Sequence, residues 1–415
     1  MIIKRDLYLS KIIERKHNGL IKIVTGIRRC GKSFLLNELF VTHLERSGVP
    51  KDHIIQLSLE GLMNQAYRDP VTAYKFITEN IRDSEIHYVI IDEVQMMKDF
   101  TEFLTGLLQI RNLDVYVTGS NSRFLSSDIA TEFRGRGDVI QLHPFRFSEF
   151  ASAYSSREEA WDDYFTFGGM PLVLSYKSRE SKEEYLSNLF NSTYLKDIVE
   201  RNNLQGESNL EELINVLASG IGSYTNPTKL EKTFLSAKNE NISHNTIDHY
   251  ISCLQDAFII SKAQRYDVKG KKYIGTPYKI YFEDIGLRNA RLNFRQVEEN
   301  HIMENILYND LAARGYRVDV GTAEGFSRDE MGKTIRKEYE IDFVINRGSE
   351  KYYIQSAYRI PDERKMIQEK KSLLQAKDAF RKIIISGNYM KQKIDEDGII
   401  HIGLLNFLMD DRMPG

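Results

Sequence analysis

Short apolar runs alternate with stretches of helical periodicity over the first 150 residues. The apolar runs span residues 20–26, 53–59, 87–92, 114–119 and 138–142. Each run has the length of one β-strand, whereas the stretches between them repeat their apolar positions every three or four residues. Strands that alternate with helices are typical of a parallel sheet with crossover helices. We therefore predict an α/β fold for residues 1–150, with a parallel sheet at its centre.

Beyond residue 150 the pattern becomes mainly helical. Residues 151–206 predict helices with a break at Gly168-Gly169-Met170-Pro171, which suits a bend between two helices, and we interpret this region as a helical lid. Residues 207–280 predict three helices and then two strands, with the basic loop Lys269-Gly270-Lys271-Lys272 between the strands. That succession is typical of a winged helix-turn-helix.

A winged helix admits two interpretations here. In the first, its third helix enters the major groove of DNA and the lysines of the basic loop contact phosphate. In the second, the module only bridges two domains. The exposed face of the third helix carries His244, Asn245, Asp248 and His249, which is not strongly basic. The sequence leaves both interpretations open.

The last region, residues 281–415, predicts a helix, three strands, a helix and a strand. Restriction-type nuclease cores hold their metal with an acid on one strand and an acid two residues before a lysine on the next. Asp342 occupies the first of these places, but Gln355 and Ala357 stand where the second acid and the lysine belong. Glu304, with Lys365 or Lys370, is a candidate for partial compensation. We therefore predict a degenerate α/β nuclease-like domain that does not cleave.

The segment after the first apolar run carries the main candidate for chemistry. Residues 26–33 match G-x-x-x-x-G-K-[ST] at every fixed position, between a predicted strand and a predicted helix. Gly26 and Gly31 allow the backbone N–H groups to curl around phosphate oxygens. Lys32 is then expected on the β- and γ-phosphates, and Ser33 on Mg²⁺. The alternative is a chance match in which both glycines are ordinary turn residues.

The variable positions of this loop are unusual because two of them are charged. Arg28 and Arg29 either contact the nucleotide, pair with acids of a neighbouring domain, or are solvated, and the sequence does not decide between these. Cys30 belongs to the same backbone turn and is counted among the expected nucleotide-binding positions.

A second apolar run ends in two carboxylates, Asp92 and Glu93. Because ligands of open α/β sheets bind at the carboxyl ends of the strands, Asp92 is the expected Mg²⁺ partner. Glu93 is expected to act as a general base on the attacking water. The alternative for this pair is a helix N-cap with a neighbour that faces the helix dipole.

Two further catalytic candidates follow the fourth predicted strand. Asn121, within Ser120-Asn121-Ser122, is expected beside the γ-phosphate, although the same residues also suit a turn with an N-cap. Arg136, with Arg134 in reserve, is a candidate for stabilising charge on the transferring phosphoryl group, either in its own chain or in a neighbouring subunit. A solvated pair of arginines at a helix end is the alternative.

Composition limits the setting of the protein. The chain has 57 basic and 59 acidic residues, so any contact with nucleic acid has to come from a local patch. Its two cysteines cannot form a disulfide framework, which favours a reducing compartment. No apolar run approaches the ~20 residues of a membrane helix, and the first residues lack the core of a signal peptide. We expect a cytoplasmic protein without a membrane partner.

The whole chain resembles prokaryotic AAA-like P-loop ATPases that carry a C-terminal nuclease-like domain of unknown function. The segments that carry the resemblance are Gly26–Ser33, Ile91–Gln95, Thr118–Ser122, Pro144–Phe150, Tyr281–Ala290 and Glu340–Phe343. The resemblance implies an ATPase core with an additional strand between its two nucleotide motifs, a winged helix, and a degenerate or intact PD-(D/E)XK-type tail. Intact tails read Glu-x-Lys, from which Gln355 and Ala357 depart, so nuclease activity is not carried over.

The expected function is therefore that of an ATPase. We expect hydrolysis of ATP to ADP and phosphate with Mg²⁺, coupled to movement of the winged-helix and C-terminal domains, with double-stranded DNA as a candidate partner. ATP is expected over GTP from the resemblance, and because no Asn-Lys-x-Asp follows the fourth strand. The alternative is a slow switch in which ATP sets a conformation for a protein partner or a homo-oligomer. An ATP-gated nuclease is a third, disfavoured hypothesis.

Overall fold

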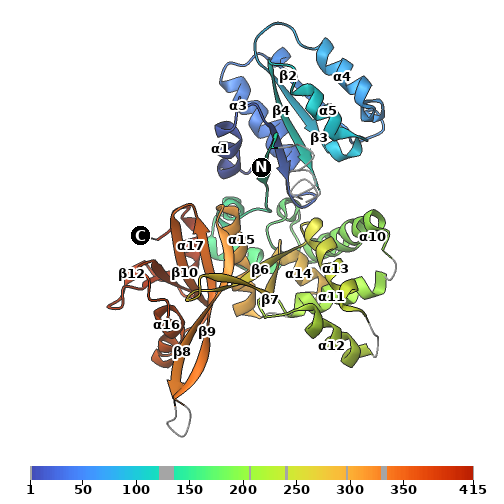
Figure 1. The fold of residues 1–415 in the computed structure, drawn as a ribbon. Coiled ribbons are helices and arrows are strands. Elements are labelled where there is room, and N and C mark those ends of the chain that lie inside the picture. Colours follow the sequence, from blue (N-terminus) through green and yellow to red (C-terminus); the bar gives the residue numbers. More distant parts are fainter. Residues whose placement is uncertain are drawn as a thin grey trace. The chain divides into compact units, whose positions relative to one another are not determined.

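The chain divides into two compact units. The computed structural model describes residues 2–120, 135–204, 207–238, 242–295, 298–328 and 334–414. The first unit contains residues 1–144 with 256–258, and the second contains 145–255 with 259–415. Each unit is described below by itself, and Figure 1 shows the elements of both. The finer division into four domains stays a prediction.

The first unit is built on a parallel sheet, as the sequence pattern predicts. Among the described residues this sheet has five strands in the order β2-β3-β4-β1-β5, and all four pairings are parallel. The strands are β1 (Ile21–Thr25), β2 (Ile54–Ser58), β3 (His87–Asp92), β4 (Leu113–Gly119) and β5 (Gly137–Gln141). The five predicted strands are confirmed to within one residue at each end.

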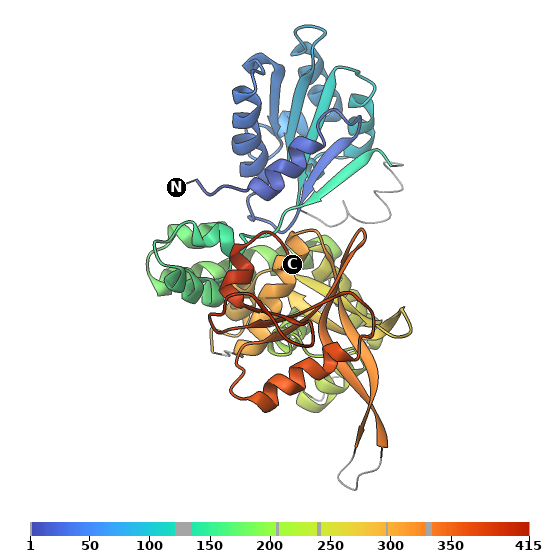
Figure 2. The same ribbon diagram turned by 90° about the vertical axis from the view of Figure 1, so that its left-hand side faces the viewer.

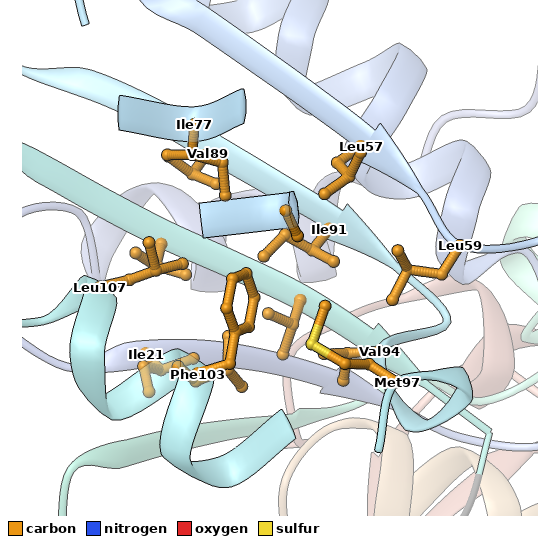
Figure 3. Close-up of a cluster of buried hydrophobic side chains, with 14 of the residues drawn as sticks. Ile21, Leu57, Leu59, Ile77, Val89, Ile91, Val94, Met97, Phe103 and Leu107 are labelled. Carbon is orange, nitrogen blue, oxygen red and sulfur yellow. The ribbon is translucent and has the colours of Figure 1, made fainter. Parts of the chain in front are cut away.

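Helices connect these strands and cover the sheet. They are α1 (Asp6–Glu14), α2 (Lys32–Phe34), the π-helical η1 (Leu35–Phe40), α3 (Val41–Arg46), η2 (Lys51–His53), η3 (Gln65–Arg68), α4 (Pro70–Glu79), η4 (Val94–Met96) and α5 (Phe100–Leu107). Figure 3 shows how Phe103 and Leu107 of α5 lie over Val89 and Ile91 of the sheet, with Ile77 of α4 beside them. Burial of these apolar side chains fixes the strands whose carboxyl ends form the site.

One polar residue interrupts the apolar core strand β1. Lys22 is fully buried, and its ammonium is paired with Asp114 of β4 and donates to the carbonyl oxygen of Leu20. Tyr116 also donates its hydroxyl to Asp114, at 2.7 Å. Removing one partner of such a buried pair costs about 3–5 kcal/mol. This network therefore ties β1 to β4, the two strands that frame the phosphate loop.

The second unit contains more helices than the first. They are α7 (Phe147–Ala151), α8 (Arg157–Phe167), η6 (Pro171–Ser175), α9 (Arg179–Leu189), the π-helical η7 (Phe190–Leu195), α10 (Lys196–Asn202), α11 (Glu207–Ser219), α12 (Pro227–Lys238), α13 (His244–Asp256), α14 (Ile285–Arg291), α15 (Glu299–Ala313), α16 (Glu363–Leu374) and α17 (Leu404–Met409). The break predicted at residues 168–171 separates α8 from η6 and α9. The structure thus confirms helices on both sides of that break.

A buried aspartate explains why residue 168, at the break, is a glycine. Asp284 precedes α14, and its Oδ2 accepts a hydrogen bond from the backbone N–H of Gly169 at 2.6 Å. A Cβ on Gly168 would lie 2.2 Å from Oδ1 of the same carboxylate. Oδ1 also accepts from the N–H of Leu287, which caps α14. Asp284 therefore joins the end of α8 to the start of α14. Residue 168 has to be a glycine because the carboxylate of Asp284 lies so close to its backbone.

The strands of the second unit form one mixed sheet. Among the described residues its eight strands follow the order β12-β13-β11-β10-β9-β8-β6-β7. They are β6 (Ile260–Asp267), β7 (Lys272–Phe282), β8 (Arg317–Arg328), β9 (Thr334–Arg347), β10 (Glu350–Ala357), β11 (Arg381–Ser386), β12 (Lys393–Ile394) and β13 (Ile400–Gly403). Strands β8 and β9 continue as a two-stranded ribbon that extends away from the other strands (Figure 2).

The three helices and two strands predicted for residues 207–280 are present as α11, α12, α13, β6 and β7. The hairpin is not an independent wing, however, because β6 pairs in parallel with β8 over Arg265 to Asp267. The hairpin therefore forms one end of the C-terminal sheet, with β7 as the edge strand. The winged-helix interpretation of this region stays a prediction.

Two helices cover opposite faces of this sheet. Val344 of β9 belongs to the core cluster that contains Leu373 of α16. The preceding residue, Phe343, contacts Tyr281, and Tyr281 stacks on Tyr308 of α15. Because successive strand residues point to opposite faces, α16 and α15 lie on different sides. The nuclease-like interpretation of this region also stays a prediction.

Candidate nucleotide site

The loop after β1 curls tightly at two glycines. Gly26 has φ 144° and Gly31 has φ 101°, a region that L side chains rarely adopt. A Cβ on Gly26 would lie 2.1 Å from the carbonyl oxygen of Leu142, so the backbone itself excludes a side chain at this position. The loop is therefore pressed against the segment that follows β5, and α2 begins directly after Gly31.

Lys32 lies within the turn of this loop. Its side chain is buried, and Nζ donates to the carbonyl oxygens of Gly26 and Ile27, each at 3.1 Å. A buried ammonium that holds only neutral carbonyls can exchange them for charged oxygens, which form stronger hydrogen bonds. The geometry therefore fits a lysine that binds an anion at the mouth of the loop.

Ser33 and Asp92 meet at the carboxyl end of the sheet. The hydroxyl of Ser33 donates to Oδ1 of Asp92 at 2.9 Å, and the hydroxyl of Thr118 donates to the same oxygen at 2.6 Å. Hydroxyl and carboxylate oxygens are the ligands that Mg²⁺ prefers, which makes this pair a fitting cation site. Asp92 does not act as a helix cap, because both recorded donors to its carboxylate are hydroxyls of other elements.

Glu93 is the next residue, and its backbone is in the left-handed region with φ 54°. Its N–H donates to Oγ1 of Thr118 at 2.8 Å. Its carboxylate accepts from the hydroxyl of Ser120 at 3.2 Å and from the side-chain amide of Gln95. No side-chain cap is formed by Glu93 at η4. The carboxylate is therefore held by polar neighbours beside Asp92.

Two catalytic candidates remain, Asn121 and Arg136. Asn121 and the reserve candidate Arg134 lie outside the described residues. Arg136 is exposed and directly precedes β5, where its carbonyl accepts from the N–H of Ile21. Because β5 runs parallel to β1, this is the edge where β1 begins, whereas the loop follows the end of β1.

Arg136 was predicted to act either in its own chain or in a neighbouring subunit, and its position contradicts the first of these roles. Five strand residues at about 3.3 Å each separate the two edges by roughly 17 Å. Arg136 therefore does not reach the loop of its own chain, and the part of the prediction that placed it there is wrong. Action on the loop of a second copy stays a prediction.

The two arginines of the loop differ in their surroundings. Arg28 lies 3.6 Å from Glu60 of the same unit, and both side chains are partly exposed, so this pair contributes little to stability. Arg29 is exposed and has φ 64°. Cys30 is buried, and its thiol donates to the carbonyl oxygen of Leu142 at 3.5 Å.

Several residues that support the site were not predicted from the sequence. Arg5, which precedes α1, is buried and donates to the carbonyl oxygens of Cys30 at 3.3 Å and His143 at 2.7 Å. No local motif marks Arg5, because its partners are 25 and 138 positions away in the chain. Thr118 and Gln95 belong to recognised motifs, and strand register could have found Thr118, since Ile91 pairs with Val117.

The lysines considered for compensation in the last region pair with acids other than Asp342. Lys365 pairs with Glu369 at 2.5 Å, and Lys370 pairs with Asp395 and Asp397. Gln355 accepts a hydrogen bond from Ser372.

Asp342 and Glu304 lie instead in a buried polar cluster with Lys279 of β7. The ammonium of Lys279 is 2.8 Å from Glu304 and 2.5 Å from Glu340. Oδ2 of Asp342 accepts from the N–H and the hydroxyl of Ser356. Burial, and then the charge of Glu304, raises the pKa of Asp342 to about 8.

Another group of potential metal ligands lies near the edge of the first unit where the strands begin. Within the described ranges, His53, Asp83 and His87 are the one group of three whose ligand atoms lie within 4.8 Å of one another. The two imidazole rings are stacked, with centroids 4.3 Å apart and planes 16° apart. Stacked rings direct their nitrogen lone pairs side by side and not toward one point. This arrangement therefore does not fit a shared metal ion.

The fold and the loop geometry together define an AAA-like P-loop ATPase. In agreement, residues 18–151 match a family described as AAA domain, and residues 158–298 match a domain of unknown function, DUF8612. An uncharacterized protein of Haemophilus influenzae is 32% identical over 98% of this chain and 99% of its own length. The chain belongs to the same family of AAA-domain proteins as this relative.

Other similarities are more distant. The uncharacterized protein MJ1544 of Methanocaldococcus jannaschii is 27% identical, over 88% of this chain and 79% of its own length. The solved structure of the Aeropyrum pernix ORC1 protein in complex with DNA is 10% identical over 70% of this chain and 92% of its own, with a TM-score of 0.28. Within the described residues, no helix has both the length and the apolar character needed to span a membrane.

Proposed function

We propose that the first unit hydrolyses ATP to ADP and phosphate. The observation that carries the proposal is the convergence of Lys32, Ser33 and Asp92 at the carboxyl end of the sheet, beside Glu93. A protein that only bound a nucleotide would have no use for a second carboxylate next to the cation site.

Each residue of this group has a distinct role in the proposed reaction. Lys32 releases the carbonyls of Gly26 and Ile27 and binds the β- and γ-phosphate oxygens. Ser33 and Asp92 would hold Mg²⁺, which would supply positive charge against the phosphate oxygens. Glu93 orients the attacking water and accepts its proton.

Three neighbours support the base in this proposal. Thr118 links the carboxylate of Asp92 to the backbone of Glu93, so it fixes the position of one acid relative to the other. Gln95 and Ser120 hold the carboxylate of Glu93. We infer that these are positioning residues and do not themselves react.

The proposed cycle acts on the second unit through the chain itself. The loop contacts Leu142 through Gly26 and Cys30, and Arg5 binds both Cys30 and His143. The chain enters the second unit two residues beyond His143. A change in the loop when phosphate binds is therefore transmitted to the segment that leads into the second unit.

Double-stranded DNA is the proposed ligand of the second unit. Lys269, Lys271 and Lys272 are exposed at the turn between β6 and β7, where they are accessible to a phosphate backbone. The alternative is a slow switch in which ATP sets the conformation for a protein partner. The switch is kept as an alternative because the exposed residues of α13 are not strongly basic.

The test is steady-state ATP hydrolysis by wild type and Glu93→Gln, with and without duplex DNA. We expect turnover by wild type and none by the variant, which should still bind ATP. Hydrolysis by Glu93→Gln at the wild-type rate would overturn the role of Glu93, and unchanged ATP affinity of Lys32→Ala would overturn the site. Faster ATP hydrolysis in the presence of DNA would favour the DNA-coupled cycle. Slow hydrolysis at a rate that DNA does not change would favour the switch.

A further inference from the structure

The buried cluster around Lys279 brings together side chains from three elements of the second unit. Lys279 comes from β7, Glu304 from α15, and Glu340 and Asp342 from β9. The ammonium lies 2.8 Å from Oε1 of Glu304 and 2.5 Å from Oε1 of Glu340. The hydroxyl of Tyr281 donates to the same oxygen of Glu304 at 2.5 Å.

Three acidic side chains in such a place need a cation, a retained proton, or both. Lys279, Glu304 and Asp342 are all less than a tenth exposed, so water does little to separate their charges. Like-charged carboxylates are stable together only if one is protonated or if a positive charge lies between them. Burial acts to lower the pKa of Lys279, but the charges of Glu304, Asp342 and Glu340 outweigh it and raise the pKa above its ordinary value.

A change in strand register places Asp342 in this cluster. Between β8 and β9 the pairing passes from Asp319–Val344 to Gly321–Ile341, so that β9 contains one additional residue. Such a bulge alters which side chains point to one face of a sheet. Ile341 and Val344 accordingly both belong to the core under α16, although three positions separate them.

We propose that Lys279 takes the place of a divalent metal ion in this carboxylate cluster. Its ammonium contacts Glu304 and Glu340 and supplies, from a fixed position in β7, the positive charge that these two carboxylates require. The second unit then binds no metal here, and the cluster serves to hold β7 against α15 and β9. The side chain of Glu340 is about one-third exposed, so this assignment does not rest on a sealed cavity.

The spacing of the carboxylates agrees with an ammonium at the centre. Within the described ranges, these three acids do not form a group whose ligand atoms all lie within 4.8 Å of one another. Ligands of one Mg²⁺ ion, at about 2.1 Å from the metal, lie closer together than that. The longer reach of N–H···O hydrogen bonds spreads the acids apart.

The first experiment measures Mn²⁺ binding by electron paramagnetic resonance without nucleotide. Full-length Asp92→Asn serves as the background, so that the proposed nucleotide site does not contribute. We expect Glu304→Gln in this background to leave Mn²⁺ binding unchanged. A tenfold loss of affinity, or loss of one bound ion per chain, on the Glu304→Gln substitution would overturn the proposal.

The second experiment removes the ammonium. Trp161 is the single tryptophan and lies in α8 of the second unit, so its fluorescence reports unfolding there. We expect Lys279→Ala to lower the melting temperature and ethylammonium to restore it, whereas Lys279→Met, which fills the same space, should not respond. A Lys279→Ala protein as stable as wild type would overturn the proposal. If Lys279→Ala does not fold, the Mn²⁺ comparison decides whether the proposal holds, because that comparison leaves Lys279 unchanged.

Discussion

The hydroxyl of Ser33 donates to Oδ1 of Asp92 across 2.9 Å, and this hydrogen bond joins α2, which follows the loop, to the end of β3. Residues 59 positions apart in the chain thus share one polar site before any ligand is bound. A cation site that is assembled in advance requires little rearrangement when Mg²⁺ and a nucleotide enter.

Ser33→Ala should weaken the dependence of ATP hydrolysis on Mg²⁺. Loss of one hydroxyl ligand is expected to raise the Mg²⁺ concentration at half-maximal activity by about tenfold, the equivalent of about 1.4 kcal/mol. Ser33→Thr keeps the hydroxyl and is the matched control. A Mg²⁺ titration that is the same for wild type and Ser33→Ala would show that Ser33 is not a ligand.

Thr118→Val should lower kcat with little change in KM for ATP. The valine has nearly the same shape but cannot donate to Asp92 or accept from Glu93. Hydrogen bonds to charged groups contribute about 1.5–3 kcal/mol, so a loss of about 10- to 100-fold is expected. Thr118→Ser should retain most of the activity, and equal losses in both variants would point to packing and not to the hydroxyl.

Gly26→Ala should destabilise the first unit and abolish ATP binding. Its Cβ would meet the carbonyl oxygen of Leu142 at 2.1 Å, and backbone cannot move aside as a flexible side chain can. Gly48→Ala is the matched control, because Gly48 also has a positive φ, of 89°, but nothing within 4 Å of the added Cβ. Thermal unfolding with and without ATP measures both effects, and equal behaviour of the two variants would contradict the importance of the Leu142 contact.

The stability of the second unit should fall as pH rises from about 4 to 8. Burial raises the pKa of Asp284 to about 7 and that of Asp342 to about 8, from an ordinary value of 3.8. Across this range the folded protein keeps protons that the unfolded chain releases, so the free energy of unfolding decreases with pH. The slope is at most about 1.4 kcal/mol per pH unit for each group.

Asp342→Asn isolates one part of this pH dependence. The amide oxygen can still accept from Ser356 but does not titrate. Urea unfolding followed by Trp161 fluorescence at pH 5 and pH 8 should therefore give a smaller difference in the variant than in wild type. A difference of the same size in both proteins would mean that Asp342 is already ionised at pH 5.

Arg136→Ala tests whether an arginine acts between copies of the chain. Arg136 lies at the edge of the sheet opposite its own loop, so any catalytic role requires a second copy. We expect Arg136→Ala and Lys32→Ala each to be inactive, and their mixture to recover part of the activity, because an intact loop then meets an intact arginine. Full activity of Arg136→Ala alone would remove this residue from the mechanism.

Much of the first unit could be predicted from the sequence because its central strands β1, β3 and β4 are buried on both faces. Such strands are continuous apolar runs, and β3 at residues 87–92 was predicted with both ends correct. The loop and the acids after β3 follow from local order alone, since parallel strands bring their carboxyl ends to one edge. The hairpin of β6 and β7 was also predicted as two strands, but its incorporation into the C-terminal sheet was not.

The sequence by itself determined the glycine loop, Lys32, Ser33 and the acids after β3, because their places depend on the backbone of a few neighbouring residues. Only the tertiary structure decided which distant side chains join them. Because β5 runs parallel to β1, Arg136 lies at the edge opposite its own loop. A register shift in β9 places Asp342 in the cluster of Lys279, whereas Lys365 and Lys370 pair with other acids. Such contacts depend on pairing between segments that are distant in the chain, and no local pattern records that pairing.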